Sequence, residues 1–236
     1  MIKIEVLYSE VCNLFGDTFN IKYLGSTIKD SQVIYTSLNE KPRFVDEDID
    51  MVYISPMSEK TQEIVINKLL PYKISIKKYI NSGKVLFALG NAFEIFGDYI
   101  ENEDGSKIEG LHITGLYAKR NMMNRYNSLY LGTIDNIKVL GYKSQFSMSY
   151  GDNEYKYVFN TIRGDGINKS SKYEGIRIKN FFGTYLLGPL FVFNPYFTKY
   201  ILRLLNVDDE NILYEEDMID CYKERLKVFE DKNTRY

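Results

Sequence analysis

The sequence is poor in the side chains that carry out most enzyme chemistry. Its 236 residues include one histidine, two cysteines and no tryptophan. The two cysteines, Cys12 and Cys221, lie far apart and show no C-x-x-C spacing, so we expect neither a metal site nor a disulfide framework. We expect no metal and no cofactor, and two free thiols fit a reducing, cytoplasmic compartment.

An excess of charge of one sign and a long apolar run are also missing. The chain has 30 basic and 32 acidic residues, interleaved, so we expect no nucleic-acid partner, which would require clustered basic residues. The longest apolar stretch, 185–193, is interrupted by Gly188 and Pro189 and is well below the roughly 18 residues of a membrane-spanning helix. The first residues resemble a strand rather than a signal peptide. We therefore expect no membrane insertion.

The N-terminal part shows an alternation of strands and helices. Apolar periodicity predicts strands at 2–8, 32–37, 51–55 and 85–89, and helices at 17–29, 59–69 and 74–80. Ser58 is placed to cap the second helix, and Pro71 to interrupt it before the third begins. This order favours an α/β fold whose central, mostly parallel sheet is covered by helices on both faces.

The pattern changes after about Glu101. Short β-rich runs between Gly, Asn and Asp turns are predicted at 129–134, 137–142, 155–159 and 175–182. Without a low-complexity linker, these runs are expected to be antiparallel β extensions of a single domain spanning residues 1–236. Asn194 and Pro195 predict a helix start. An apolar stripe within 210–229 predicts a last helix that docks on its own domain, with partner binding as the alternative.

Two segments have the form of an active site. They are KVLFALGNAFEIFG at 84–97 and GTYLLGP at 183–189. The first predicts a buried strand, a tight Gly-Asn-Ala elbow and then a helix, a geometry that holds one residue above the carboxyl end of a sheet. A nucleophile is expected at that position. The residue there is Gly90, or Leu89 if the elbow is placed one residue earlier.

Both segments resemble class I glutamine amidotransferases of the cobyric acid synthase type. In that family the strand ends in a pattern like G-I-C-G-G-Y-Q-L-L-G, and the later segment reads G-T-Y-L-H-G-P. In this alignment Gly90 stands at the nucleophilic cysteine and Leu187 at the catalytic histidine. Asn91 falls on a glycine and Glu94 on the glutamine. The resemblance implies the three-layer α/β sandwich of this class.

Further segments resemble, within this family, the glutaminase subunits of lipid II isoglutaminyl synthases, which work with a Mur ligase-like partner in peptidoglycan synthesis. NLFGDTFNI at 13–21 is similar to their N-L-Y-x-D-x-G-N-I. VYISPMSEKTQ at 52–62 is similar to F-F-I-G-G-G-x-D-x-E-Q, with Ser55, Pro56 and Met57 in place of the three glycines. The resemblance implies a Mur ligase-like partner subunit, and glutamine or another amino acid as a ligand.

The residues needed for glutamine hydrolysis are replaced. This chemistry requires a thiolate to attack the amide and a histidine to move the proton. Gly90 has no side chain, and Leu187 cannot carry a proton. In the segment 141–149, where the relatives are glycine-rich, Phe146 and Met148 predict a partly filled pocket. The sequence therefore predicts a catalytically degenerate pseudo-glutaminase, a structural or regulatory subunit of a Mur ligase-like amidating complex.

Two alternatives remain open at this point. A relocated pair of Cys12 and His112 would make an active glutaminase or hydrolase. Arg125, in an Asn-Arg pair similar to one beside the relatives' glutamine site, would hold an α-carboxylate and make an amino-acid sensor together with Glu94 and Asn91. The competing interpretations are a half-buried structural His112 in a strand, a surface Arg125 that makes ion pairs, and a solvent-facing Glu94.

Overall fold

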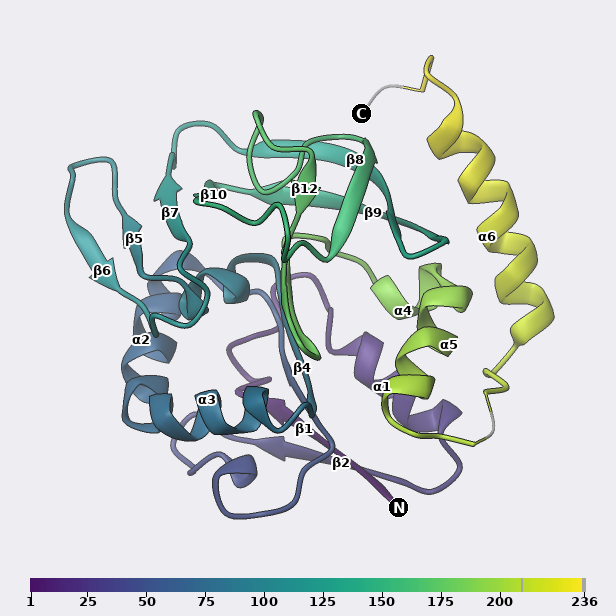
Figure 1. Ribbon diagram of the computed structural model, residues 1–236, viewed down its shortest axis with the longest axis horizontal. Helices are drawn as coiled ribbons and strands as arrows, with labels where there is room; N and C mark the ends of the chain where they lie inside the picture. Colours follow the sequence, from purple (N-terminus) through teal and green to yellow (C-terminus); the bar gives the residue numbers. More distant parts are fainter. Residues whose placement is uncertain (209, 235–236) are drawn as a thin grey trace.

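A six-stranded sheet forms the centre of the molecule (Figure 1). The computed structural model describes residues 1–208 and 210–234. The strand order is β13-β14-β4-β3-β1-β2. The parallel strands are β1 (Ile2–Leu7), β2 (Ser31–Thr36), β3 (Met51–Ile54), β4 (Val85–Leu89) and β14 (Phe181–Thr184), and the edge strand β13 (Ile176–Ile178) is antiparallel to β14. The mostly parallel sheet predicted from the sequence is confirmed.

Helices cover both faces of this sheet. One face carries η1 (Arg43–Val45), α2 (Glu59–Leu69), η2 (Leu70–Tyr72) and α3 (Lys73–Asn81), and the other carries α1 (Phe19–Thr27), α4 (Leu190–Phe193) and α5 (Pro195–Leu204). Side chains of a strand alternate between the two faces. Val52 and Ile54 accordingly lie in one buried core, and Met51 and Tyr53 in the other. The three-layer α/β sandwich is confirmed.

Two four-stranded sheets extend from this core, with the orders β10-β7-β5-β6 and β12-β11-β8-β9. Their strands are β5 (Tyr99–Glu101), β6 (Lys107–Glu109), β7 (Tyr117–Arg120), β8 (Tyr126–Ile134), β9 (Ile137–Gln145), β10 (Ser147–Tyr150), β11 (Phe159–Arg163) and β12 (Tyr173–Glu174). Their pairings are antiparallel except for β5 with β7. These are the β extensions expected from the sequence.

The prediction of a strand at 155–159 is wrong. Tyr155 lies in a turn with 89% of its surface exposed, and strand β11 begins only at Phe159. The Asn153 side chain fixes this turn by donating to the carbonyls of Tyr173 at 3.1 Å and Gly175 at 2.8 Å. Further along, the run predicted at 175–182 is split by a turn into β13 and β14.

The last helix, α6 (Glu215–Glu230), packs along the β8–β9 hairpin (Figure 1). Tyr222 and Phe229 are buried against Leu131 and Leu140. The predicted docking of this helix on its own domain is confirmed. None of the helices in the described part of the chain is long and apolar enough to cross a membrane.

Two residues predicted at helix starts, Ser58 and Asn194, have different roles in the structure. Ser58 caps α2 as predicted, because its side chain accepts a hydrogen bond from the N–H of Thr61 at 3.2 Å. Asn194 precedes α5 as predicted, but its side chain does not cap the helix. The buried Asn194 amide instead accepts from the N–H of Leu140 and donates to the Leu140 carbonyl, both at 2.8 Å. It therefore ties α5 to β9.

Candidate functional site

Strand β4 ends in the elbow that the sequence predicts. Leu89 still has extended backbone, with φ −103° and ψ 150°. Gly90 follows with φ +56°, a left-handed conformation that glycine adopts without the steric cost of a Cβ. The chain then continues as a short 3-10 helix, η3 (Gly90–Phe96), which includes the predicted Gly-Asn-Ala elbow instead of following it. Gly90 is therefore the elbow residue, and the alternative register at Leu89 is wrong.

The space above Gly90 is filled by two side chains. A Cβ built on Gly90 would lie 2.7 Å from Cβ of Pro56 and 3.2 Å from Cδ2 of Leu187. The first distance is too short for two carbon atoms, so a side chain at position 90 requires Pro56 to move. The structure thus brings Gly90 and Leu187 together, as the family alignment requires of a nucleophile and its base. Neither residue has a group that transfers protons or attacks a carbonyl.

A cavity of about 220 Å³ lies beside the elbow. Its walls include the loop after β1, residues 56–59, the elbow itself, the end of β9 and Leu187. Two residues predicted to bind a ligand, Asn91 and Arg125, line it. Phe146 lines it as well, in agreement with the predicted partial filling. The walls are mainly apolar, so any ligand would be positioned by few polar groups.

Of the two predicted ligand residues on this cavity, one is hydrogen-bonded within the fold and the other has no carboxylate partner among the described residues. Asn91 is used by the fold, because its Oδ1 accepts from the N–H of Met57 at 3.0 Å and its Nδ2 donates to the Met57 carbonyl at 2.6 Å. Arg125 is exposed, and its guanidinium lies 4.6 Å from the ring centre of Phe146. The described residues give Arg125 no carboxylate partner, so the expected surface ion pair is not observed. Its charge is available to an anionic ligand.

Glu94 takes neither of the positions expected from the sequence. It is 3% exposed and lies outside the lining of the cavity. Its carboxylate accepts from Nε2 of Gln62 at 2.9 Å, from the hydroxyl of Tyr185 at 2.8 Å and from the hydroxyl of Ser147. Burial raises the pKa of Glu94, and these hydrogen bonds oppose that rise. Glu94 therefore joins η3 to three other elements rather than facing a ligand or solvent.

Cys12 and His112 do not form a catalytic pair. Cys12 is fully buried, with its sulfur 3.7 Å from that of Met57, and burial raises the pKa of the thiol to about 12. His112 lies in a loop after β6, where its ring nitrogens approach Glu109 at 3.0 Å and Asp98 at 3.4 Å. The expected half-buried position of His112 in a strand is wrong, because its backbone is left-handed and 43% of its side chain is exposed.

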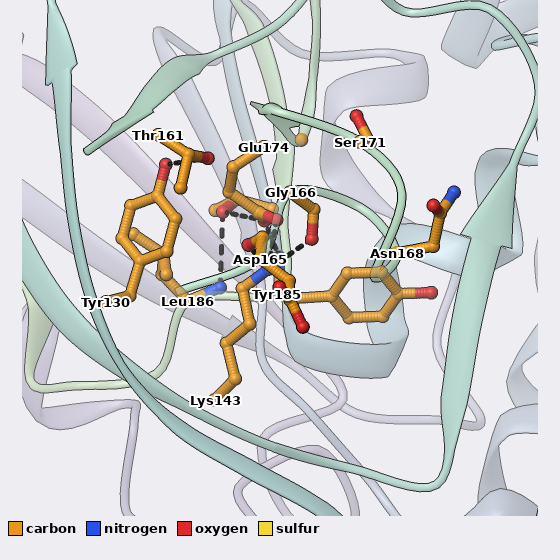
Figure 2. Close-up of polar contacts among 12 residues, drawn as sticks. Tyr130, Lys143, Thr161, Asp165, Gly166, Asn168, Ser171, Glu174, Tyr185 and Leu186 are labelled. Carbon is orange, nitrogen blue, oxygen red and sulfur yellow. Dashed lines mark hydrogen bonds and ion pairs between the residues drawn. The ribbon is translucent and has the colours of Figure 1, made fainter. Parts of the chain in front are cut away.

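The segment that carries Leu187 is fixed at one end by a buried ion pair (Figure 2). Glu174 accepts from the hydroxyl of Thr184 at 2.9 Å and from the N–H of Tyr185 at 2.8 Å. Its second oxygen pairs with the ammonium of Lys143, which also donates to the carbonyls of residues 165 and 166 at 2.8 and 2.6 Å. All polar groups of this pair are therefore satisfied inside the protein.

Asp17 fixes the other end of the segment. Its Oδ1 accepts from the N–H of Gly188 at 3.1 Å, whereas its buried Oδ2 has no hydrogen-bond partner among the described residues. Burial raises the pKa of Asp17 from 3.8 to about 6. Between these ends, the N–H of Leu187 donates to the carbonyl of Tyr142 at 2.9 Å. Leu187 is thus held against the elbow by the backbone on both sides.

Sequence reasoning missed most of these positioning residues. Asp17 had a signal, because it lies in the segment NLFGDTFNI that resembles the family. Tyr185 likewise lies within GTYLLGP. No sequence signal identified Lys143 and Glu174. Lysine and glutamate side chains are usually exposed, and these two lie far apart in the sequence.

We predict that Lys143→Met destabilises the protein by about 3–5 kcal/mol, because it leaves the Glu174 carboxylate buried without its counter-charge. The double variant Lys143→Met/Glu174→Gln should recover much of this loss, since the buried charge is removed and the amide still accepts both hydrogen bonds. Urea unfolding measures both effects. The matched control is Lys138→Met, which breaks an exposed pair with Glu230 and should cost less than about 1 kcal/mol. A loss in Lys143→Met no larger than this control would contradict the assignment.

We predict that ionisation of Asp17 weakens the fold as pH rises. Because its folded pKa of about 6 lies above the ordinary value of 3.8, the folded state binds more protons than the unfolded state between these values. The contribution of this group to stability therefore falls by about 2 kcal/mol from about pH 4.5 to about pH 7.5. Asp17→Asn should flatten the pH dependence of the free energy of unfolding by this amount. An unchanged pH profile in the variant would show that Asp17 titrates normally.

Comparison with known proteins agrees with the geometry of the elbow. The family model of the CobB/CobQ-like glutamine amidotransferase domain matches residues 3–195. The chain is 26% identical over 198 residues to the lipid II isoglutaminyl synthase (glutamine-hydrolyzing) subunit GatD of Streptococcus pneumoniae, covering 80% of this chain and 74% of that protein. It is 26% identical over 197 residues to the same subunit of Staphylococcus aureus, covering 83% and 80%.

A solved structure shares the fold. A crystal structure of a glutamine amidotransferase superposes with a TM-score of 0.58 at 12% identity, covering 86% of this chain and 99% of the other. Together with the left-handed elbow at the end of β4, the match over residues 3–195 shows that the chain belongs to the CobB/CobQ-like glutamine amidotransferase family.

Proposed function

We propose that this protein is a pseudo-glutaminase, a cytoplasmic structural or regulatory subunit of a Mur ligase-like amidating complex. The observation that carries the proposal is the packing at the elbow. A side chain on Gly90 would collide with Pro56, and the neighbouring position of the family's histidine is occupied by Leu187. Covalent hydrolysis of glutamine needs a nucleophile and a proton carrier at these two places.

The thiols elsewhere in the chain are poor substitutes for the missing nucleophile. With a pKa of about 12, only about one Cys12 in 10⁵ is a thiolate near neutral pH. Cys12 is also fully buried and has a sulfur neighbour in place of a general base. Cys221 is exposed on α6, outside the lining of the elbow cavity. These features favour a subunit without glutaminase activity over a relocated enzyme.

The role of a subunit is inferred from the relatives. Both curated relatives are named as subunits of lipid II isoglutaminyl synthase, and this chain matches most of their length. A Mur ligase-like partner would then receive free ammonia rather than nitrogen released from glutamine by this chain. The fold is preserved in the elements that surround the elbow, which fits a subunit retained for its surface and its shape.

An amino-acid sensor is the second candidate. Arg125 favours it, because this arginine lines the elbow cavity and has no carboxylate partner among the described residues. A guanidinium in this state can hold an α-carboxylate bidentately. The apolar walls of the 220 Å³ cavity would then surround the side chain of a small amino acid.

We predict that the purified protein releases no glutamate from glutamine above the rate of a buffer blank, measured by a coupled glutamate dehydrogenase assay. Cys12→Ser and His112→Ala should leave this baseline unchanged. Glutamate release by the wild type that is lost in Cys12→Ser would contradict the proposal. The subunit role is tested separately by purification from a native lysate. There, copurification of a Mur ligase-like chain is expected, and a monomer without such a chain counts against the subunit.

For the sensor, we predict saturable heat on titration with glutamine, reduced at least about tenfold in affinity in Arg125→Ala because the carboxylate loses its bidentate partner. The matched control is Arg163→Ala. This arginine lies outside the elbow cavity, and its guanidinium donates to the carbonyls of Phe229 at 2.7 Å and Asp231 at 3.0 Å. Equal affinity in the wild type and in Arg125→Ala would reject the sensor.

A further inference from the structure

A second, larger hollow adjoins the elbow cavity. This groove measures about 600 Å³ and is lined by residues of β7, β10, the start of β8 and the end of β9. It shares Arg125, Gln145 and Phe146 with the elbow cavity and extends away from it to Lys169. Among the described residues, four cationic residues and no acidic residue line it. The groove is therefore lined by positive charge only, although the whole chain has slightly more acidic residues than basic ones, 32 against 30.

Two of the four cations are neutralised within the protein. Arg120 is buried, donates to Oε1 of Gln62 at 2.7 Å and pairs with Glu63 at 3.1 Å. Lys119 pairs with Glu101, also at 3.1 Å, and this contact raises the pKa of the lysine. These two residues shape the groove but contribute little free charge to it.

The other two cations are available. The structure gives neither Arg125 nor Lys169 a carboxylate partner within residues 1–208 and 210–234. The Arg125 guanidinium lies 4.6 Å from the centre of the Phe146 ring, and the Lys169 ammonium lies 5.9 Å from that of Tyr126. Contact with an aromatic face attracts a cation without neutralising its charge. Both charges therefore remain able to bind an anion.

A buried amide lies where the groove and the elbow cavity meet. Gln145 is 7% exposed, and its Nε2 donates to the carbonyl of Ser147 at 2.6 Å. Its Oε1 is buried and has no hydrogen-bond partner among the described residues. Leaving a buried acceptor unpaired costs about 1–3 kcal/mol, and this oxygen would take a hydrogen bond from a ligand hydroxyl rather than contact an anionic oxygen. The side chains of Asn121 and Asn124 add further hydrogen-bonding groups to the same groove.

We propose that this groove binds a small organic polyanion, with its phosphate or carboxylate groups paired to Arg125 and Lys169. A guanidinium and an exposed ammonium both bind anionic oxygens, the first bidentately and the second as a point charge. The volume of about 600 Å³ is in the range of small-molecule sites. The site extends beyond the elbow cavity, because Lys169 lines the groove but not that cavity.

Isothermal titration calorimetry of the full chain tests this site with two probes, inorganic pyrophosphate and citrate. We expect saturable binding of at least one of them, weakened at least about tenfold in Arg125→Ala and in Lys169→Ala through loss of a charge-assisted contact. Binding of pyrophosphate alone identifies a phosphate ligand, and binding of citrate alone a carboxylate ligand. The matched control is Lys172→Ala, an exposed lysine outside the groove, which should bind as the wild type does.

Three results would overturn the proposal. The first is the absence of saturable heat with both probes. The second is equal weakening in Lys172→Ala and Lys169→Ala, which would indicate unspecific attraction to a positive surface. The third is a probe affinity that Arg125→Ala abolishes and Lys169→Ala leaves unchanged, together with displacement of the probe by glutamine. This result would place the anion in the elbow cavity. The variants replace exposed side chains, and coincident urea unfolding curves confirm that each has folded.

Discussion

Three buried carboxylates hold residues 184–188 in place, two through the backbone and one through a side chain, and the geometry of the elbow depends on them. Glu174 and Asp17 accept backbone N–H groups at the two ends of this segment, and Glu94 accepts the hydroxyl of Tyr185 between them. A buried carboxylate without such partners is strongly unfavourable, so the segment and Glu174 stabilise each other, whereas the contribution of Asp17 falls as this group ionises. The result is a rigid wall beside Gly90 that does not depend on the side chain at position 187.

This wall accounts for a fold that is kept although Gly90 and Leu187 stand at the elbow. Removing a nucleophile from a packed site would leave a void, and the cost of a void grows with its volume. Here Pro56 and Leu187 fill the space above Gly90 with apolar atoms. The elbow is therefore packed by apolar atoms on the side of Pro56 and Leu187 and borders the cavity on another side. A thiol at position 90 would require changes at Pro56 and Leu187 as well, because it would have neither room nor a base there.

The sequence predicted those features whose signals are local. Ser58 identified the start of α2, and Gly90 the elbow, because strand, turn and helix signals adjoin in the chain. Features that depend on distant partners were missed. Glu94 is buried because its three side-chain partners come from α2, β10 and the segment after β14. Lys143 is buried for the same reason, and the run 155–159 is a turn because Asn153 binds carbonyls twenty or more residues away.

Arg125 connects the two hollows on this side of the molecule, since it and Phe146 line both. The guanidinium lies 4.6 Å from the centre of the Phe146 ring, and an anion in the groove would compete with a ligand of the elbow cavity for its N–H groups. A ligand of the groove would therefore alter the charge available to a ligand of the elbow, a coupling that is reciprocal by thermodynamic necessity. For the proposed pseudo-glutaminase, such coupled binding would be a use of the amidotransferase fold that requires no hydrolysis.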